Sequence, residues 1–188
     1  MTVSSVKTGD LGISFALNNN YMEPIATTLV GSGGQNSVIF DDIPQTYSHL
    51  HLRYISRNAS ATDTTIINFN GDFGSANYTR HQLRGDGSSG TAMGVANTYT
   101  MELPFTTYSG LTANVFGIGF IDILDYTNTN KNKVIRGMGG AEYNTSGYLV
   151  AALNNMWMST DAIKKITISP NTGNLEQYSR FSLYGVKG

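Results

Sequence analysis

The stretch Tyr47-Ser48-His49-Leu50-His51-Leu52-Arg53-Tyr54-Ile55 alternates between polar and apolar side chains. In a β-strand, successive side chains point to opposite faces, so this pattern places one set on the core side and the other toward solvent. The first set is Leu50, Leu52 and Tyr54, and the second is His49, His51 and Arg53. This segment therefore predicts a strand with one buried face.

Similar short segments, each bounded by Gly, Asn, Asp or Pro, follow along the whole chain, and no apolar stripe of three helical turns occurs. A series of short strands without helices between them predicts an all-β protein, an antiparallel β-sandwich of jelly-roll type. We expect one sandwich domain over residues 13–188, preceded by a polar N-terminal arm over residues 1–12. The expected strands are Ile13–Leu17, Pro24–Val30, Ser37–Phe40, Tyr47–Ile55, Thr64–Phe69, Asn77–Arg84, Asn97–Leu103, Val115–Leu124, Lys133–Arg136, Tyr148–Leu153, Ile163–Ser169 and Tyr178–Val186.

The composition excludes several classes of function. The 188 residues include 12 Lys and Arg against 13 Asp and Glu, a net charge of -1, so the chain lacks the field that gathers nucleic acid or an anionic membrane surface. With no cysteine, it can form no disulfide, thiolate metal site or cysteine nucleophile. No long apolar segment or cleavable signal is recognisable, so we expect neither membrane insertion nor export.

Loops rich in Gly, Asn, Ser and Thr are the expected binding regions, because loops on a rigid sandwich commonly carry binding residues. Three stand out: Gly31–Asn36, Gly85–Gly90 and Tyr126–Asn132. Their short polar side chains suit a neutral sugar or a protein neighbour, although solvated turns are the simpler interpretation. The candidate binding residues are Asp86, Tyr126, Asn128 and Asn130 in these loops and Trp157, which could instead be a core anchor. A further turn, Asn70-Gly71-Asp72, predicts a tight hairpin.

Asp122 lies in the most apolar of the expected strands, so burial would require a hydrogen-bonding or ionic partner. Arg53 and Arg136 are the expected structural partners. No second carboxylate stands at a recognisable catalytic spacing, and no nucleophile or phosphate-binding motif is present. We therefore expect no enzymatic activity and no cofactor.

The three histidines, His49, His51 and His81, are the only imidazole ligands that the chain could offer a metal. His49 and His51 would share a strand face, but the alternation explains that face as the solvated one. We expect no metal site.

Several motifs resemble a family of tailed-bacteriophage virion proteins, with matches from about residue 37 to the C-terminus. The matching motifs are Ile43–Arg53, Phe69-Asn70-Gly71-Asp72, His81-Gln82-Leu83, Gly85-Asp86-Gly87, Ile121–Tyr126, Asn128-Thr129-Asn130-Lys131, Trp157-Met158-Ser159 and Phe181–Gly188. Similar sequences often carry glutamine at the position of His51, which also disfavours a metal at that histidine. The first 36 residues lack this resemblance.

The resemblance implies a non-enzymatic virion structural protein, made in the host cytoplasm and used in many copies. We expect it in the tail or host-adhesion apparatus, acting through assembly interfaces with other virion proteins and forming a homo-oligomer. A capsid decoration or head-fibre protein is one alternative. A module that binds a host surface glycan is another, and neither nucleic acid nor membrane insertion is expected.

Overall fold

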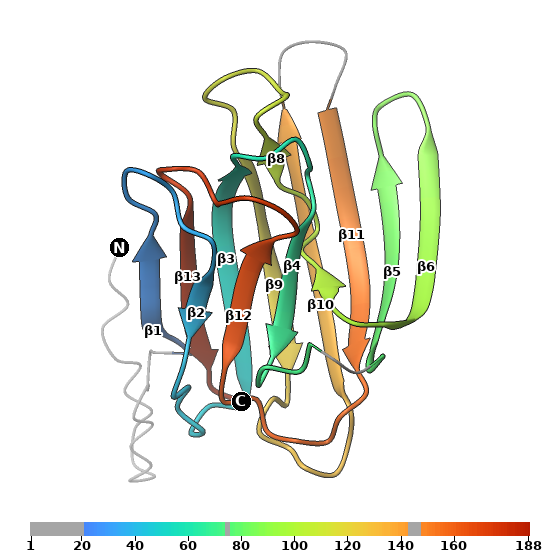
Figure 1. The fold of residues 1–188 in the computed structure, drawn as a ribbon. Helices are drawn as coiled ribbons and strands as arrows, with labels where there is room; N and C mark the ends of the chain where they lie inside the picture. The colour runs from blue at the N-terminus through green and yellow to red at the C-terminus, as the bar shows by residue number, and fades with distance from the viewer. Residues whose placement is uncertain (1–20, 74–75, 143–147) are drawn as a thin grey trace, which may run out of the picture.

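The computed structural model describes residues 21–73, 76–142 and 148–188, and these fold into two β-sheets packed face to face (Figure 1). The described residues contain no helix, and nearly all strand pairs are antiparallel. The expected β-sandwich is thus confirmed, and its jelly-roll connection stays a prediction. The N-terminal arm and the strand expected at Ile13–Leu17 lie outside the described residues.

The larger sheet has the order β1-β13-β3-β9-β10-β11-β5-β6, and a short β8 pairs in parallel with β3. Its central strands β9, β10 and β11 follow one another in the chain and form an antiparallel meander. The strands are β1 (Met22–Leu29), β3 (His49–Asn58), β5 (Tyr78–Gly85), β6 (Gly90–Thr98), β8 (Thr107–Tyr108), β9 (Gly117–Leu124), β10 (Lys133–Glu142), β11 (Tyr148–Trp157) and β13 (Arg180–Val186).

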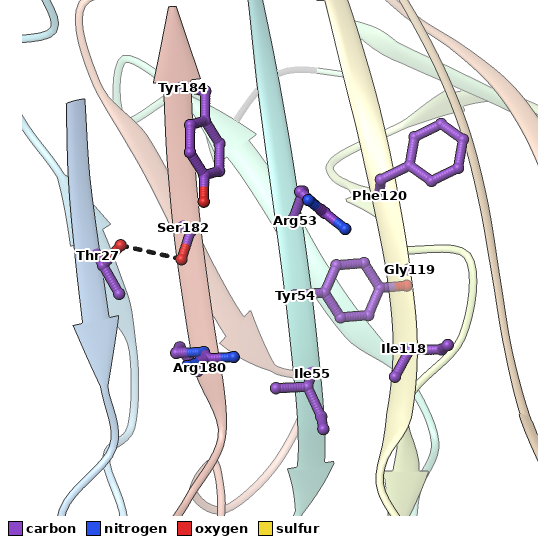
Figure 2. A pocket seen from close by; sticks show the side chains of 10 residues that line it. All are labelled: Thr27, Arg53, Tyr54, Ile55, Ile118, Gly119, Phe120, Arg180, Ser182 and Tyr184. Atoms are coloured by element: carbon purple, nitrogen blue, oxygen red, sulfur yellow. Dashed lines mark hydrogen bonds between the residues drawn. The ribbon is translucent and has the colours of Figure 1, made fainter. Parts of the chain in front are cut away.

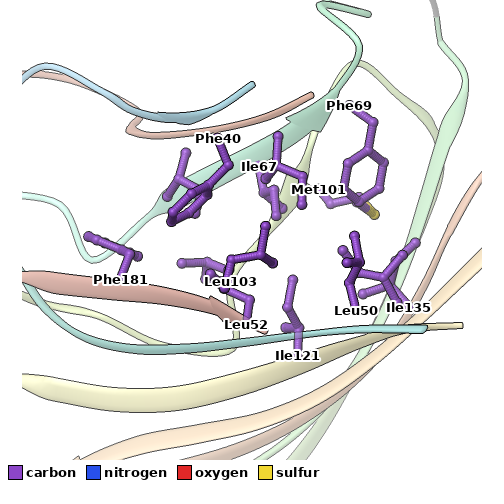
Figure 3. Packing of buried hydrophobic residues seen from close by; sticks show 14 of the residues in the cluster. Phe40, Leu50, Leu52, Ile67, Phe69, Met101, Leu103, Ile121, Ile135 and Phe181 are labelled. Carbon is purple, nitrogen blue, oxygen red and sulfur yellow. The ribbon is translucent and has the colours of Figure 1, made fainter. Parts of the chain in front are cut away.

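The smaller sheet, of order β2-β12-β4-β7, lies over one face of the larger sheet. Its strands are β2 (Val38–Phe40), β4 (Thr65–Phe69), β7 (Met101–Glu102) and β12 (Ile166–Pro170). Figure 3 shows the apolar layer between the two sheets, where Phe40, Ile67 and Phe69 meet Leu52 and Ile121. Leu50, Leu52 and Tyr54 are buried as the alternation predicted.

The strand predictions were least accurate at one edge of the larger sheet. Gly85–Gly90 forms a loop as expected, but the chain then continues as β6, an edge strand that was not predicted. Almost every residue of β6 is exposed, so its sequence carries no alternation between buried and solvated positions. The strand expected at Asn97–Leu103 is divided between the last two residues of β6 and the two residues of β7.

The turn at Asn70 and Gly71 adopts positive φ values of 52° and 75°, as an Asn-Gly pair readily does. Asp72 N donates a hydrogen bond to Phe69 O at 2.9 Å, which closes the turn. The predicted hairpin is nevertheless wrong, because β4 before the turn belongs to the smaller sheet and β5 after it to the larger. This turn connects the two sheets.

Candidate functional site

The smaller sheet leaves the opposite face of the larger sheet uncovered, and we call this the outer face. Cross-strand register aligns its side chains in rows. One row runs Thr27, Ser182, Arg53, Phe120, Met138, Ala152, Leu83, and a neighbouring row runs Arg180, Ile55, Ile118, Gly140, Val150. The outer face therefore combines arginines, hydroxyls and large apolar side chains.

Asp122 is the centre of a polar cluster on this face. His51 Nδ1 lies 2.6 Å from Asp122 Oδ1, and Arg136 Nε lies 3.3 Å from Asp122 Oδ2. The His51 ring also stacks on Phe120 at a centroid distance of 5.5 Å. Both carboxylate oxygens are engaged, which suits a structural role rather than proton transfer.

Two details of this cluster differ from the sequence-based expectation. The Asp122 side chain is only partly buried, with 23% of its area exposed. Arg136 is a partner of Asp122, but Arg53 is not, because the register pairs Arg53 with Phe120 and Asp122 with His51. The histidine was not foreseen as the second partner. Arg53 also lies on the outer face, where it lines a groove.

The groove that Arg53 lines has a volume of about 650 Å³ and lies over β1, β13, β3 and β9 (Figure 2). Arg53 on β3 and Arg180 on β13 line it, and the hydroxyl side chains of Ser182 and Tyr184 lie on the same strand as Arg180. Thr27 Oγ1 donates a hydrogen bond to Ser182 Oγ at 2.9 Å. The groove residues that sequence reasoning missed are Thr27, Ile118, Phe120, Arg180, Ser182 and Tyr184. Only the cross-strand register brings them together.

Two of the candidate binding residues belong to the core instead. Trp157 is buried, its ring packs beside Phe69, and its indole N–H donates to Asp72 Oδ2 at 2.8 Å. Tyr126 is also buried, and its hydroxyl donates to the carbonyl of Pro44. Neither aromatic ring can stack on a ligand at the surface, so the binding prediction for these two residues is corrected to a packing role.

The other loop candidates are exposed but hold their own turns together. Asp86 accepts hydrogen bonds from the backbone N–H groups of Ser89 at 2.7 Å and Ser88 at 2.9 Å, which lowers the pKa of its carboxyl to about 2. Asn128 Oδ1 likewise accepts from the backbone N–H of Asn130 at 2.8 Å. These contacts favour the solvated-turn interpretation.

The three polar loops also lie apart from one another. The loop Gly85–Gly90 begins at Gly85, which the sheet register aligns through Val150 and Gly140 with Ile118, near the start of β9. The loop Tyr126–Asn132 follows Leu124, at the other end of β9. Gly31–Asn36 follows β1, at the edge opposite β5 and β6. Figure 1 shows this separation. The loops therefore cannot form one joint binding site.

The three histidines do not form a common metal site. His49 and His51 share the outer face as expected, and His49 Nδ1 accepts the backbone N–H of Asp125 at 2.9 Å, while His81 lies on β5. Within the part of the chain that the structure describes, no group of three or more metal-ligating side chains occurs.

Two buried cations were missed by sequence reasoning. Lys133 points into the interior, and its Nζ donates to the carbonyls of Asn128, Lys131 and Thr160 at 2.7, 3.1 and 2.9 Å. Its burial lowers the pKa of the ammonium group. The signal was present, because Lys133 alternates with buried Ile135 along β10. Lys133 thus ties the β9–β10 loop to the segment before β12.

Arg57, at the end of β3, holds a loop in place at the opposite end of the sheet. Its guanidinium donates to the carbonyls of Leu111, Thr112 and Val115 and pairs with Glu176 at 2.5 Å. No pattern in the sequence marks this residue, because its acceptors are backbone atoms of a distant loop.

Comparison of the chain with protein-family models, with curated proteins and with solved structures finds no match. Within residues 21–73, 76–142 and 148–188, no helix is long and apolar enough to cross a membrane. The chemistry of the outer face therefore carries the functional argument.

Proposed function

We propose that the chain is a non-enzymatic structural subunit of a tailed-phage virion, part of its tail or adhesion apparatus, and that copies assemble through the outer face. The observation that carries the assembly role is an apolar strip of Leu83, Ile118, Met138 and Val150. Their exposed fractions are 63%, 59%, 49% and 56%. Large apolar side chains gathered on one face mark interaction surfaces.

The strip is contiguous across four strands. Ile118 and Val150 lie on either side of Gly140, and Met138 and Leu83 lie on either side of Ala152. Within the strip, each row thus has one small residue between two large apolar side chains. A second copy related by a two-fold axis could place its large side chains over the small ones, which is the self-complementarity that a symmetric interface requires.

The oligomeric part of this proposal is tested by light scattering on the purified chain. We expect an oligomer, and Val150→Glu should yield a monomer with the circular dichroism spectrum of the wild type, because a buried carboxylate opposes association. The matched control is Ile39→Glu, at an exposed isoleucine of the smaller sheet, which should remain an oligomer. A monomeric wild type would refute assembly through this face.

The virion part is tested separately, by mass spectrometry of purified particles of the encoding phage and by gold labelling with an antibody against the chain. Label on the tail supports the proposal. Label on the head would favour the decoration or head-fibre alternative. Absence of the chain from purified particles would refute a virion role altogether.

A further inference from the structure

The groove between β1, β13, β3 and β9 carries two guanidiniums, and neither has a counter-charge among the described residues. Arg53 and Arg180 are exposed and occupy diagonal positions, because Ser182 aligns with Arg53 and Arg180 with Ile55. No carboxylate oxygen of the described residues lies within 4.0 Å of either one. Two neighbouring cations repel each other, and an anion bound between them would relieve that repulsion.

This positive charge is local. The whole chain carries a net charge of -1, so Arg53 and Arg180 do not belong to a generally basic surface of the kind that binds nucleic acid. Arg136, the nearby arginine on the same face, is neutralised by Asp122. The groove therefore suits a ligand with a single anionic group rather than a polyanion.

Hydroxyl groups line the groove beside the arginines. Thr27 donates its hydroxyl hydrogen to Ser182, which leaves the Ser182 hydrogen free to donate to a ligand. The Tyr184 side chain lies next to Ser182 along β13 (Figure 2). Phe120 and Ile118 supply apolar surface on the opposite side. The guanidiniums can pair with an acid group of a ligand, and the hydroxyls can exchange hydrogen bonds with its hydroxyl groups. The aromatic ring can pack against its C–H groups.

We propose that this groove binds a sugar that bears a carboxylate. The guanidinium fork pairs with a planar carboxylate through two parallel hydrogen bonds, and the hydroxyls exchange hydrogen bonds with the sugar. A volume of about 650 Å³ lies in the range of small-ligand sites and holds one or two sugar rings. The inference goes beyond the proposed virion role and does not depend on it.

The test is titration calorimetry of the purified full chain with two sugars that each bear one carboxylate, galacturonic acid and 3′-sialyllactose. Lactose serves as the neutral probe, and sodium sulfate and sodium phosphate as plain anions. We expect an acidic sugar to bind and lactose to bind at least about tenfold more weakly. Arg53→Gln and Arg180→Gln should each weaken binding about tenfold or more, because each removes a charge-assisted contact.

The matched control is Arg136→Gln, which removes the same charge from the same face outside the groove and should leave binding unchanged. The Arg53 and Arg180 variants should keep the circular dichroism spectrum of the wild type, because both side chains are exposed. Equal affinity for lactose, binding of sulfate or phosphate alone, or no binding of either acidic sugar at about 10 mM would each overturn the proposal. None of these outcomes bears on whether the chain is in a virion.

Discussion

Replacing Lys133 with methionine tests whether a buried ammonium group stabilises this fold. Lys133 is fully buried on β10 and donates three hydrogen bonds to backbone carbonyls of two separate loops. Methionine has a similar length and keeps most of the apolar contacts of the lysine stem. The substitution therefore removes the charge and its three hydrogen bonds while leaving the packing largely intact.

The expected magnitude follows from opposing contributions. Hydrogen bonds to a charged group contribute about 1.5–3 kcal/mol each, so three of them stabilise the fold by on the order of 5 kcal/mol. Burial of the ammonium costs several kcal/mol, which methionine avoids, and the acceptors lie in loops where water can partly replace the lysine. We expect a net loss of about 2 kcal/mol, or a melting temperature lower by about 4–8 °C.

The measurement is thermal unfolding followed by circular dichroism, with hydrogen exchange to localise the effect. Faster exchange is expected at the backbone amides of Asn128 and Ile163, which donate to Asp125 O and Tyr126 O in the two segments that Lys133 holds together. Lys131→Met is the control, because this exposed lysine pairs with Asp125 at the surface and should cost less than about 1 kcal/mol. A melting temperature of Lys133→Met equal to or above that of the wild type would show that desolvation outweighs the hydrogen bonds.

Three further outcomes are expected. Gly119→Ala should cost about 1–3 kcal/mol in chemical denaturation, because its methyl group would collide with the buried Tyr54 ring; an unchanged midpoint would contradict the packing described here. Asp122→Ala should cost about 1–2 kcal/mol, because His51 loses its carboxylate partner, and an unchanged melt would show that the cluster contributes nothing. By NMR, the Asp86 carboxyl should titrate near pH 2. Since the folded pKa lies below the unfolded value of about 3.9, its contribution to stability is present above that value and lost as the pH falls through 2; titration near 4 would mean that the turn is open.

The glycan and assembly proposals use adjoining parts of the outer face, and Ile118 lies in both. The groove occupies the β1 to β9 side, and the apolar strip extends from β9 across to β5. A variant at Val150 should therefore alter association without altering sugar binding. A variant at Arg180 should do the reverse.

Sequence alone determined the class of fold and much of the core. The alternation over His49–Ile55 identified the buried face of β3, because burial against a second sheet acts on every other residue and leaves that period in the sequence. The same reasoning failed for β6, an edge strand exposed along nearly its whole length, and no alternation could mark it.

The tertiary structure alone decided which residues meet on the outer face. Arg53, Phe120 and Arg180 lie on three strands far apart in the chain, and their alignment depends on the register of β13, β3 and β9. Likewise, Tyr126 and Trp157 stand among polar loop residues or methionines in the sequence, yet both pack into the core. Local patterns report the face of a single strand, whereas strand order and register are set by packing between distant segments, which no local pattern records.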